Sequence, residues 1–186
     1  MSFYRDQLED YLSGQHIKAD RVLDVGGAAK PVKDRVASWD VKEYMIADNG
    51  LENSIIGKDF VFIDLNDHRD FPKEQKFDLV FCLEVMEYIW QPNVAIYNLS
   101  QLVKENGRLI ITFPFIYPVH RPIEADFLRY TPGGATKILA ECGFKTEAIH
   151  SRIDRSGKLL EFYKADGMHV AGNAYVTGVI IEARKV

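Results

Sequence analysis

Three aspartates stand at the ends of short apolar runs, and a glycine pair follows the first of them. The runs are RVLDV, EYMIAD and FVFID, and their acids are Asp24, Asp48 and Asp64. Gly26 and Gly27 let the backbone turn tightly and approach a ligand closely. Asp48 lies 22 residues beyond Gly26, where a carboxylate accepts hydrogen bonds from both hydroxyls of a ribose. The spacing therefore predicts a site for a nucleoside at the strand ends.

Each of these features also has a simpler interpretation when it is taken alone. A glycine pair after a strand indicates a turn, and an acid at a strand end indicates a solvated residue or a helix cap. Asp64 fits either an adenine amino group or a capped turn. Glu84 and Glu87 lie three residues apart and fit a cation site, a contact that orients a substrate, or a solvated helix start. Only the order and the intervals of the features together favour a binding site.

A second group of reactive side chains lies between residues 114 and 130. This segment, PFIYPVHRPIEADFLRY, joins a histidine and two arginines to several aromatic residues. The ordinary pKa of histidine suits a general base near neutral pH, so His120 is the catalytic candidate. The alternative is structural, because Asp126 and Arg129 can pair and fix the loop. The predicted substrate-pocket residues are Tyr88, Tyr117, Arg129 and Tyr130.

The apolar runs predict a buried parallel sheet. Continuous rather than alternating hydrophobicity is typical of strands that are covered on both faces. The expected strands are 21–25, 43–48, 60–64, 77–82, 108–113, 144–150 and 174–185. The expected helices are 3–12 with Ser2 as its N-cap, 31–38, 92–103, 132–142 capped by Thr131, and a short one near 159–163.

Composition and charge exclude several classes of protein. The net charge of −4 over 186 residues provides no positive field that would gather nucleic acid. We find no secretory signal and no apolar run of the ~18 residues that span a bilayer. Cys82 and Cys142 lie in apolar stretches and are predicted to be buried free thiols, with no metal site. A cytoplasmic protein is expected, without nucleic-acid or membrane partners.

The order of motifs resembles the class I S-adenosylmethionine-dependent methyltransferase family, in particular its small bacterial members of the type 11 kind. The motifs, RVLDVGG, YMIAD, FIDLND, FDLVFCLEVMEY, GRLIITFP and ECGF, begin at Arg21 and run through most of the chain. The resemblance implies an α/β, doubly wound, Rossmann-like fold. Its sheet would have seven mainly parallel strands, an antiparallel last strand beside the fifth, and helices on both faces. Residues 1–186 would form a single domain, with an N-terminal helix at 1–14 and an acceptor-side loop at 114–130.

The resemblance also implies S-adenosylmethionine as cofactor and assigns residues to its parts. The methionine part would lie along Asp24, Gly26, Gly27 and Ala28; the ribose at Asp48 and Asn49; the adenine at Asp64 and Leu65; and the sulfonium above Cys82, Leu83 and Glu84. Ala28 and Lys30 stand where the family has glycines, and Tyr88 stands where it often has histidine. Lys30 would bring a positive charge near a cationic cofactor, or pair with the carboxylate of that cofactor.

The leading hypothesis is an enzyme that methylates an oxygen or nitrogen of a small molecule or of a carrier-linked sugar. A degenerate methyltransferase-like domain that serves as a binding or scaffold partner is the alternative. A nicotinamide dehydrogenase fits less well, since the run from Gly26 is GGAAKP and not GxGxxG. Little chain precedes the first strand, so we expect no N-terminal lid and an open pocket, with a homodimer as the hypothesis for what completes it.

Overall fold

The described part of the chain forms one seven-stranded sheet in the order β3-β2-β1-β4-β5-β7-β6. The structure is a computed structural model, which describes residues 3–49, 60–67, 75–119, 121–168 and 175–186. Its strands are β1 His16–Val25, β2 Ser38–Asp48, β3 Phe60–Phe62, β4 Phe77–Cys82, β5 Val103–Pro114, β6 Phe144–Ile153 and β7 Val176–Lys185. Neighbouring strands are parallel except that β7 runs antiparallel to both β5 and β6. The predicted fold class and the position of the last strand are confirmed.

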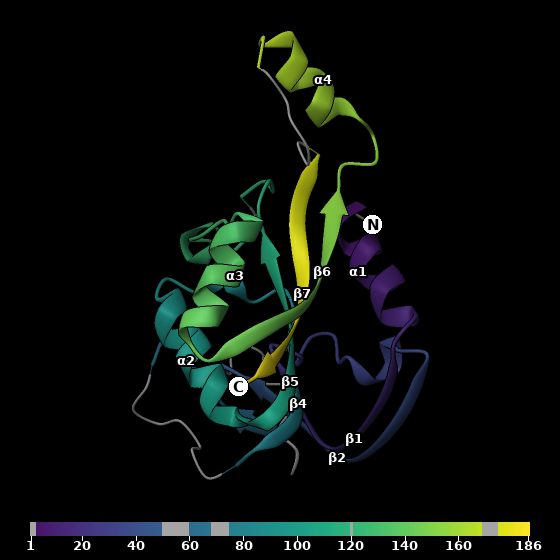
Figure 1. Ribbon diagram of the computed structural model, residues 1–186, viewed down its shortest axis with the longest axis vertical. Helices are drawn as coiled ribbons and strands as arrows, with labels where there is room; N and C mark the ends of the chain where they lie inside the picture. The colour runs from purple at the N-terminus through teal and green to yellow at the C-terminus, as the bar shows by residue number, and fades with distance from the viewer. Residues whose placement is uncertain (1–2, 50–59, 68–74, 120, 169–174) are drawn as a thin grey trace.

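Helices cover both faces of the sheet (Figure 1). Helix α1 (Phe3–Ser13) lies on one face, and α2 (Pro92–Leu102) and α3 (Pro132–Glu141) lie on the other. Both α2 and α3 begin with proline, which fits the first turn because its missing N–H has no partner there. Thr131 caps α3 as predicted, since its Oγ1 accepts a hydrogen bond from the N–H of Gly134 at 3.1 Å.

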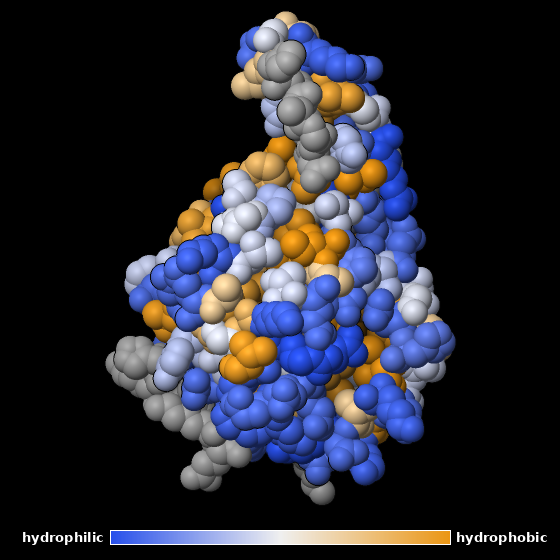
Figure 2. Space-filling view, in the orientation of Figure 1, coloured by the Kyte–Doolittle hydropathy of each residue, from blue (hydrophilic) through white to orange (hydrophobic). Residues whose placement is uncertain are grey.

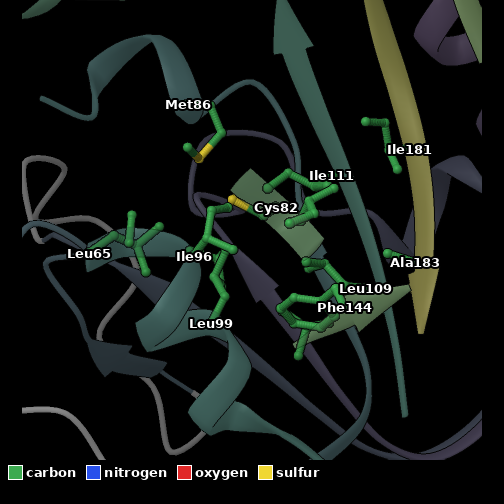
Figure 3. Close-up of a cluster of buried hydrophobic side chains, with 14 of the residues drawn as sticks. Leu65, Cys82, Met86, Ile96, Leu99, Leu109, Ile111, Phe144, Ile181 and Ala183 are labelled. Atoms are coloured by element: carbon green, nitrogen blue, oxygen red, sulfur yellow. The ribbon is translucent and has the colours of Figure 1, made fainter. Parts of the chain in front are cut away.

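The larger core fills the space between the sheet and the α2–α3 layer (Figure 3). Cys82 of β4, Ile111 of β5 and Ile181 of β7 are fully buried there against Ile96 and Leu99 of α2. A smaller core lies under α1, whose buried side chains recur at helical spacing. Burying apolar surface on both faces of β4 explains why FDLVFC is apolar nearly throughout.

The predicted helix over 31–38 is wrong. Only the single 3₁₀ turn η1 (Lys33–Arg35) forms there. Strand β2 begins at Ser38, well before the predicted strand starts. The N–H groups of Ala37 and Ser38 donate to the carbonyl of Gln15, and that of Val32 donates to Asp24, so these groups bind distant partners and not a preceding helical turn. The predicted cap Ser2 lies outside the described residues.

The fourth helix, α4 (Lys158–Ala165), projects from the end of the β6–β7 hairpin (Figure 1). None of its residues is buried. Hydrophobic side chains gather in the upper half of the face shown in Figure 2, and Phe162 of α4 is 63% exposed.

Within the described ranges, no helix has the length and apolar content that a membrane span requires.

The two cysteines differ in burial. Cys82 is buried, as predicted, and Cys142 is half-buried, so the prediction of a second buried thiol is wrong. Cys142 follows the last residue of α3, and its Sγ contacts the carbonyl oxygen of Asn93 at 3.7 Å at an exposed position. Both are free thiols.

Candidate active site

A cavity of about 300 Å³ lies over the carboxyl ends of β1, β2, β3 and β4. The chain leaves β1 toward β2 and β3 on one side, and β4 lies on the other side. Ligands of doubly wound sheets bind at such a reversal of strand order. The lining residues are Val25, Gly26, Ala28, Ala29, Asp48, Asn49, Ile63, Asp64, Leu65, Asn66, Glu84, Val85, Tyr88, Ile89, Pro122 and Ala125.

The turn after β1 needs both of its glycines. Gly26 has a φ angle of +79°, and a Cβ there would lie 2.3 Å from Cγ2 of Val85. A Cβ on Gly27 would lie 2.3 Å from Oδ2 of Asp24. The turn therefore packs directly onto the segment after β4 on one side and onto a buried carboxylate on the other. Neither contact leaves room for a side chain.

Asp24 lies behind the cavity wall, not in it. Its side chain is 2% exposed, and its Oδ2 accepts hydrogen bonds from the N–H of Val32 at 2.8 Å and the hydroxyl of Tyr44 at 2.7 Å. Burial raises the pKa of Asp24 to about 6, although these two hydrogen bonds act to lower it. Asp24 therefore holds the loop after β1 in place from beneath.

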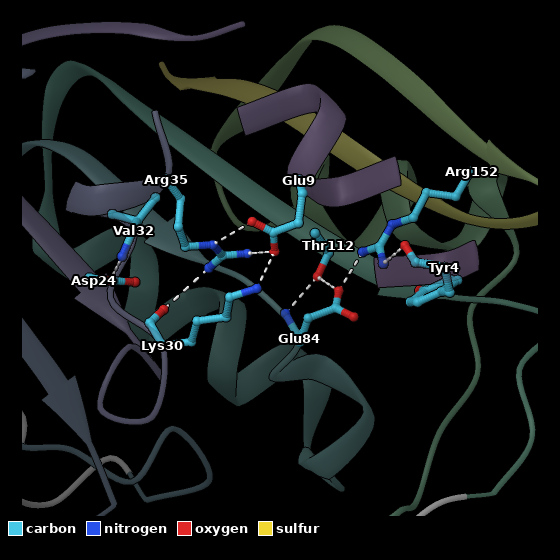
Figure 4. Close-up of polar contacts among 9 residues, drawn as sticks. All are labelled: Tyr4, Glu9, Asp24, Lys30, Val32, Arg35, Glu84, Thr112 and Arg152. Carbon is cyan, nitrogen blue, oxygen red and sulfur yellow. Dashed lines mark hydrogen bonds and ion pairs between the residues drawn. The ribbon is translucent and has the colours of Figure 1, made fainter. Parts of the chain in front are cut away.

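Lys30, which the sequence placed near the cofactor, is not among the lining residues. Its Nζ lies 2.6 Å from Oε1 of Glu9 in α1 (Figure 4). Glu9 also binds Arg35, with Nη2 at 2.8 Å from Oε1 and Nε at 3.1 Å from Oε2. Helix α1 thus draws Lys30 and Arg35 of the loop to its own carboxylate.

The tips of β2 and β3 present carboxylates whose positions are fixed by the backbone. Asp48 accepts hydrogen bonds from the N–H of Asn49 at 2.8 Å and of Ala28 at 3.3 Å. Asp64 accepts from the backbone N–H of Asn66 at 2.9 Å. The side-chain amide of Asn66 also donates to the same oxygen of Asp64 at 3.3 Å. These contacts orient both carboxylates at the cavity wall, and each carboxylate keeps at least one lone pair for a ligand donor.

The tip of β4 contributes a third carboxylate, which is tied into the interior. The side chain of Glu84 binds Thr112 of β5 and Arg152 of β6 (Figure 4). Arg152 is 1% exposed and stacks on the ring of Tyr4, with Cζ 3.8 Å from the ring centroid. A path of contacts therefore runs from α1 through Arg152 to the cavity.

The loop after β5 docks onto the segment after β4 and closes one side of the cavity. The N–H groups of Phe127 and Leu128 donate to the carbonyl of Glu87 at 2.8 and 3.3 Å. Pro122 and Ala125 of this loop line the cavity. Sequence reasoning assigned this loop to the acceptor side but selected other residues of it.

The predicted substrate residues fall into different places. Tyr88 lines the cavity, and burial raises its pKa to about 12, so it is a neutral phenol at neutral pH. Arg129 binds Asp126 at 2.5 and 2.7 Å and the carbonyl of Tyr117 at 3.1 Å, so it fixes the loop. Tyr117 packs on Tyr4 and lines a second cavity of about 180 Å³. Tyr130 is buried with its hydroxyl on the carbonyl of Met86, and His120 lies outside the described residues.

The predicted cofactor residues divide between the wall and the layer behind it. The lining includes Gly26, Ala28, Asp48, Asn49, Asp64, Leu65 and Glu84. The layer behind contains Asp24, Gly27, Cys82 and Leu83. The prediction missed six lining residues that are next to predicted positions in the sequence, namely Val25, Ala29, Ile63, Asn66, Val85 and Ile89, and it missed the loop residues Pro122 and Ala125. Proximity to a strand tip was the only available signal for the first six.

The wall is acidic and partly apolar. It carries three carboxylates, those of Asp48, Asp64 and Glu84, and no lysine, arginine or histidine among the lining residues that the structure describes. Such a wall attracts a positively charged ligand with hydroxyl and amino donors. A mainly parallel sheet with an antiparallel strand inside one edge, and a cavity of this kind at its carboxyl end, defines the class I methyltransferase type.

Comparisons with known proteins agree with this class. The family model described as methyltransferase domain matches residues 2–132. An S-adenosylmethionine-dependent methyltransferase from Mesorhizobium loti has a TM-score of 0.60 at 12% identity, over 99% of this chain and 98% of that one. The N-methyltransferase NodS from Bradyrhizobium japonicum, solved with S-adenosylhomocysteine, has a TM-score of 0.62 at 15% identity, over 98% and 87%. The [4+2]-cyclase SpnF has a TM-score of 0.61 at 19% identity, over 97% and 80%.

The structural likenesses show the fold, and the family model shows the family. No curated protein sequence matches the chain. The chain belongs to the methyltransferase domain family, and the protein is an enzyme of that family. The alternative of a nicotinamide dehydrogenase is thereby set aside.

Proposed function

We propose that the cavity binds S-adenosylmethionine and that the enzyme methylates an oxygen or nitrogen of a small molecule or carrier-linked sugar. The observation that carries this proposal is the order of the strand tips. Along β3-β2-β1-β4 the tips bring Asp64, Asp48, Gly26 and Glu84 to one wall. Adenine, ribose and the methionine end would follow one another along this row. Lys30 is held by Glu9, so its ammonium group stays away from this row.

The protein's own residues supply orientation and charge. The bound cofactor would provide a methyl group that is already activated on a sulfonium. The three carboxylates of the wall favour that positive charge, and Tyr88 adds a neutral phenol to the same wall. Pro122 and Ala125 close the acceptor side, and holding reactants in register lowers the barrier of a displacement. Val85, packed on Gly26, fixes the distance between the loop and the tip of β4.

The cofactor assignment is tested by calorimetry with S-adenosylhomocysteine on Asp48→Ala. We expect affinity to fall by tenfold or more, because the variant loses a ribose acceptor worth about 1.5 kcal/mol or more. Asp40→Ala is the matched control, since Asp40 lies on the same strand, is 77% exposed and pairs with Lys18 at 3.9 Å, away from the cavity. Unchanged affinity in Asp48→Ala would refute the ribose assignment.

The wild-type titration also tests whether the domain keeps a cofactor site, which a degenerate, scaffold-type domain would lack. Binding of S-adenosylmethionine and S-adenosylhomocysteine supports the enzyme. If neither ligand bound at millimolar concentration, the proposal of a cofactor site would fall and the scaffold alternative would gain.

We retain His120 as the proposed general base for an acceptor that must lose a proton. It stands two residues before Pro122, which lines the cavity. His120→Ala should bind S-adenosylhomocysteine normally and turn over at least about a hundredfold more slowly. Full turnover by this variant would show that His120 is not the base.

A cytoplasmic homodimer completes the proposal. The free thiols of Cys82 and Cys142 suit a reducing compartment. Helix α4 projects with Phe162 exposed, and a second copy of the chain would cover this side chain. Sedimentation of the wild type and of Phe162→Ser tests this: a dimer that the substitution weakens supports the assignment, and a wild-type monomer overturns it.

A further inference from the structure

Glu84 has a backbone conformation that its residue type normally avoids. Its φ angle is +57°, in the left-handed region that glycine adopts freely and that few residues with a Cβ adopt. Residues keep such conformations where the surroundings fix them, often at functional sites. Glycine would adopt this backbone conformation without strain. A glutamate at this position is therefore explained by what its side chain does.

That side chain is held at one oxygen. Oε1 accepts hydrogen bonds from Oγ1 of Thr112 at 2.9 Å and from Nη2 of Arg152. Oγ1 of Thr112 in turn accepts the backbone N–H of Glu84 at 2.7 Å. The side chain of Glu84 is 27% exposed, whereas that of Arg152 is 1% exposed. Both partners bind Oε1, which leaves Oε2 for the cavity whose wall includes Glu84 (Figure 4).

The charge of the wall selects among acceptors. An ionised carboxylate only accepts hydrogen bonds. An acceptor that bears a carboxylate or phosphate at the reacting end would meet the carboxylate of Glu84, with no lysine, arginine or histidine among the described lining residues to bind it; Arg152 lies behind Glu84 and is 1% exposed. An amine instead offers N–H donors and becomes positively charged when it is methylated. The carboxylate of Glu84 favours the positive charge that forms on the methylated nitrogen.

We propose that Glu84 is an acceptor-binding residue, whose Oε2 receives an N–H of an amine acceptor, and that Arg152 and Thr112 are positioning residues that hold it there. The inference rests on the proposed cofactor site and names the acceptor class. In the transfer, the nitrogen lone pair forms the new C–N bond and the electron pair of the broken C–S bond stays on sulfur. The positive charge therefore moves from sulfur to nitrogen, beside the carboxylate of Glu84.

The test uses two cofactor analogues and needs no identified acceptor. Sinefungin carries an amine-bearing carbon in place of the methylated sulfur, so its amine occupies the place of the transferring group. S-adenosylhomocysteine has nothing at that place. Calorimetry on the full chain gives the ratio of the two affinities. For Glu84→Gln we expect sinefungin to bind at least tenfold more weakly, while S-adenosylhomocysteine stays within threefold.

Asp64→Asn is the matched control, because it removes another carboxylate of the same wall at the proposed adenine end. It should weaken both ligands by the same factor and leave their ratio unchanged. Should Glu84→Gln fail to fold, Glu84→Gln with Arg152→Met removes both charges of the buried pair and takes its place. S-adenosylhomocysteine binding then reports that the fold is intact.

Two results would overturn the inference while leaving the cofactor site standing. Equal losses for the two ligands in Glu84→Gln would mean that Glu84 binds the amino-acid end of the cofactor. If Glu84→Gln bound both ligands as tightly as the wild type does, Glu84 would face neither the amine of sinefungin nor the amino-acid end of the cofactor. If the wild type bound neither ligand, the proposed function itself would fail, and the acceptor inference with it.

Discussion

Asp24 allows a prediction in which one buried carboxylate changes the pH dependence of stability. Its folded-state pKa is about 6, raised from 3.8 mainly by burial. The folded state therefore binds a proton more tightly than the unfolded chain does. The contribution of Asp24 to stability is greatest below pH 3.8 and is lost as the pH rises through 6.

The magnitude follows from the two pKa values. One pKa unit corresponds to about 1.4 kcal/mol, so keeping Asp24 ionised in the folded state costs about 3 kcal/mol above both values. Roughly 2 kcal/mol of this appears between about pH 4.5 and about pH 7.5. The amide of the Asp24→Asn variant cannot ionise. The free energy of unfolding of Asp24→Asn minus that of the wild type should therefore rise by about 2 kcal/mol over this range.

The assay is urea unfolding, followed by tryptophan fluorescence, of both proteins across that pH range. The difference between the two proteins cancels the titration of every other group. Any fixed penalty for placing an amide between Val32 and Tyr44 shifts the difference by a constant and does not change its slope. Asp34→Asn, at an exposed position of η1, is the control: it measures how replacing aspartate by asparagine changes the free energy of unfolding where the carboxylate is not buried.

A companion variant sharpens the test. Tyr44 donates a hydrogen bond to the carboxylate of Asp24 and thereby lowers its pKa. Tyr44→Phe should raise the pKa of Asp24, and the titration should move to higher pH. A difference between Asp24→Asn and the wild type that is flat with pH would refute the reasoning, because burial would then carry no electrostatic penalty at this position.

Three further predictions concern the loop and the buried ion pair. Gly27→Ala should lower the free energy of unfolding by about 2 kcal/mol in urea titrations, since its Cβ would lie 2.3 Å from a buried carboxylate oxygen. Glu9→Ala should weaken S-adenosylhomocysteine binding at least threefold in calorimetry, because it releases Lys30 toward an acidic cavity that favours a cation. Equal affinity would show that the loop after β1 keeps its position without Glu9. Arg152→Met should destabilise the fold by about 3 kcal/mol, and adding Glu84→Gln should recover most of that loss.

The sequence determined the strand tips and the fold class. Continuous apolar runs specify strands covered on both faces, and the acid or glycine that ends each run marks where the strand stops. Because parallel strands end at one edge, Gly26, Asp48 and Asp64 could be expected to meet, and they line one cavity. The sequence did not determine how far β1 and β2 extend, since their outer parts alternate in polarity and pair only with each other there.

The sequence allowed the local pair of Asp126 and Arg129, but only the tertiary structure decided which distant residues the other charged side chains bind. Lys30 binds Glu9 of α1, and Glu84 binds Arg152 of β6, at separations of 21 and 68 residues along the chain. Periodicity and turn residues describe a local segment and carry no information about which distant element packs against it. The choice of Pro122 and Ala125 over Tyr117 and Tyr130 for the cavity wall has the same origin, because the docking of the loop fixes which of its side chains face inward.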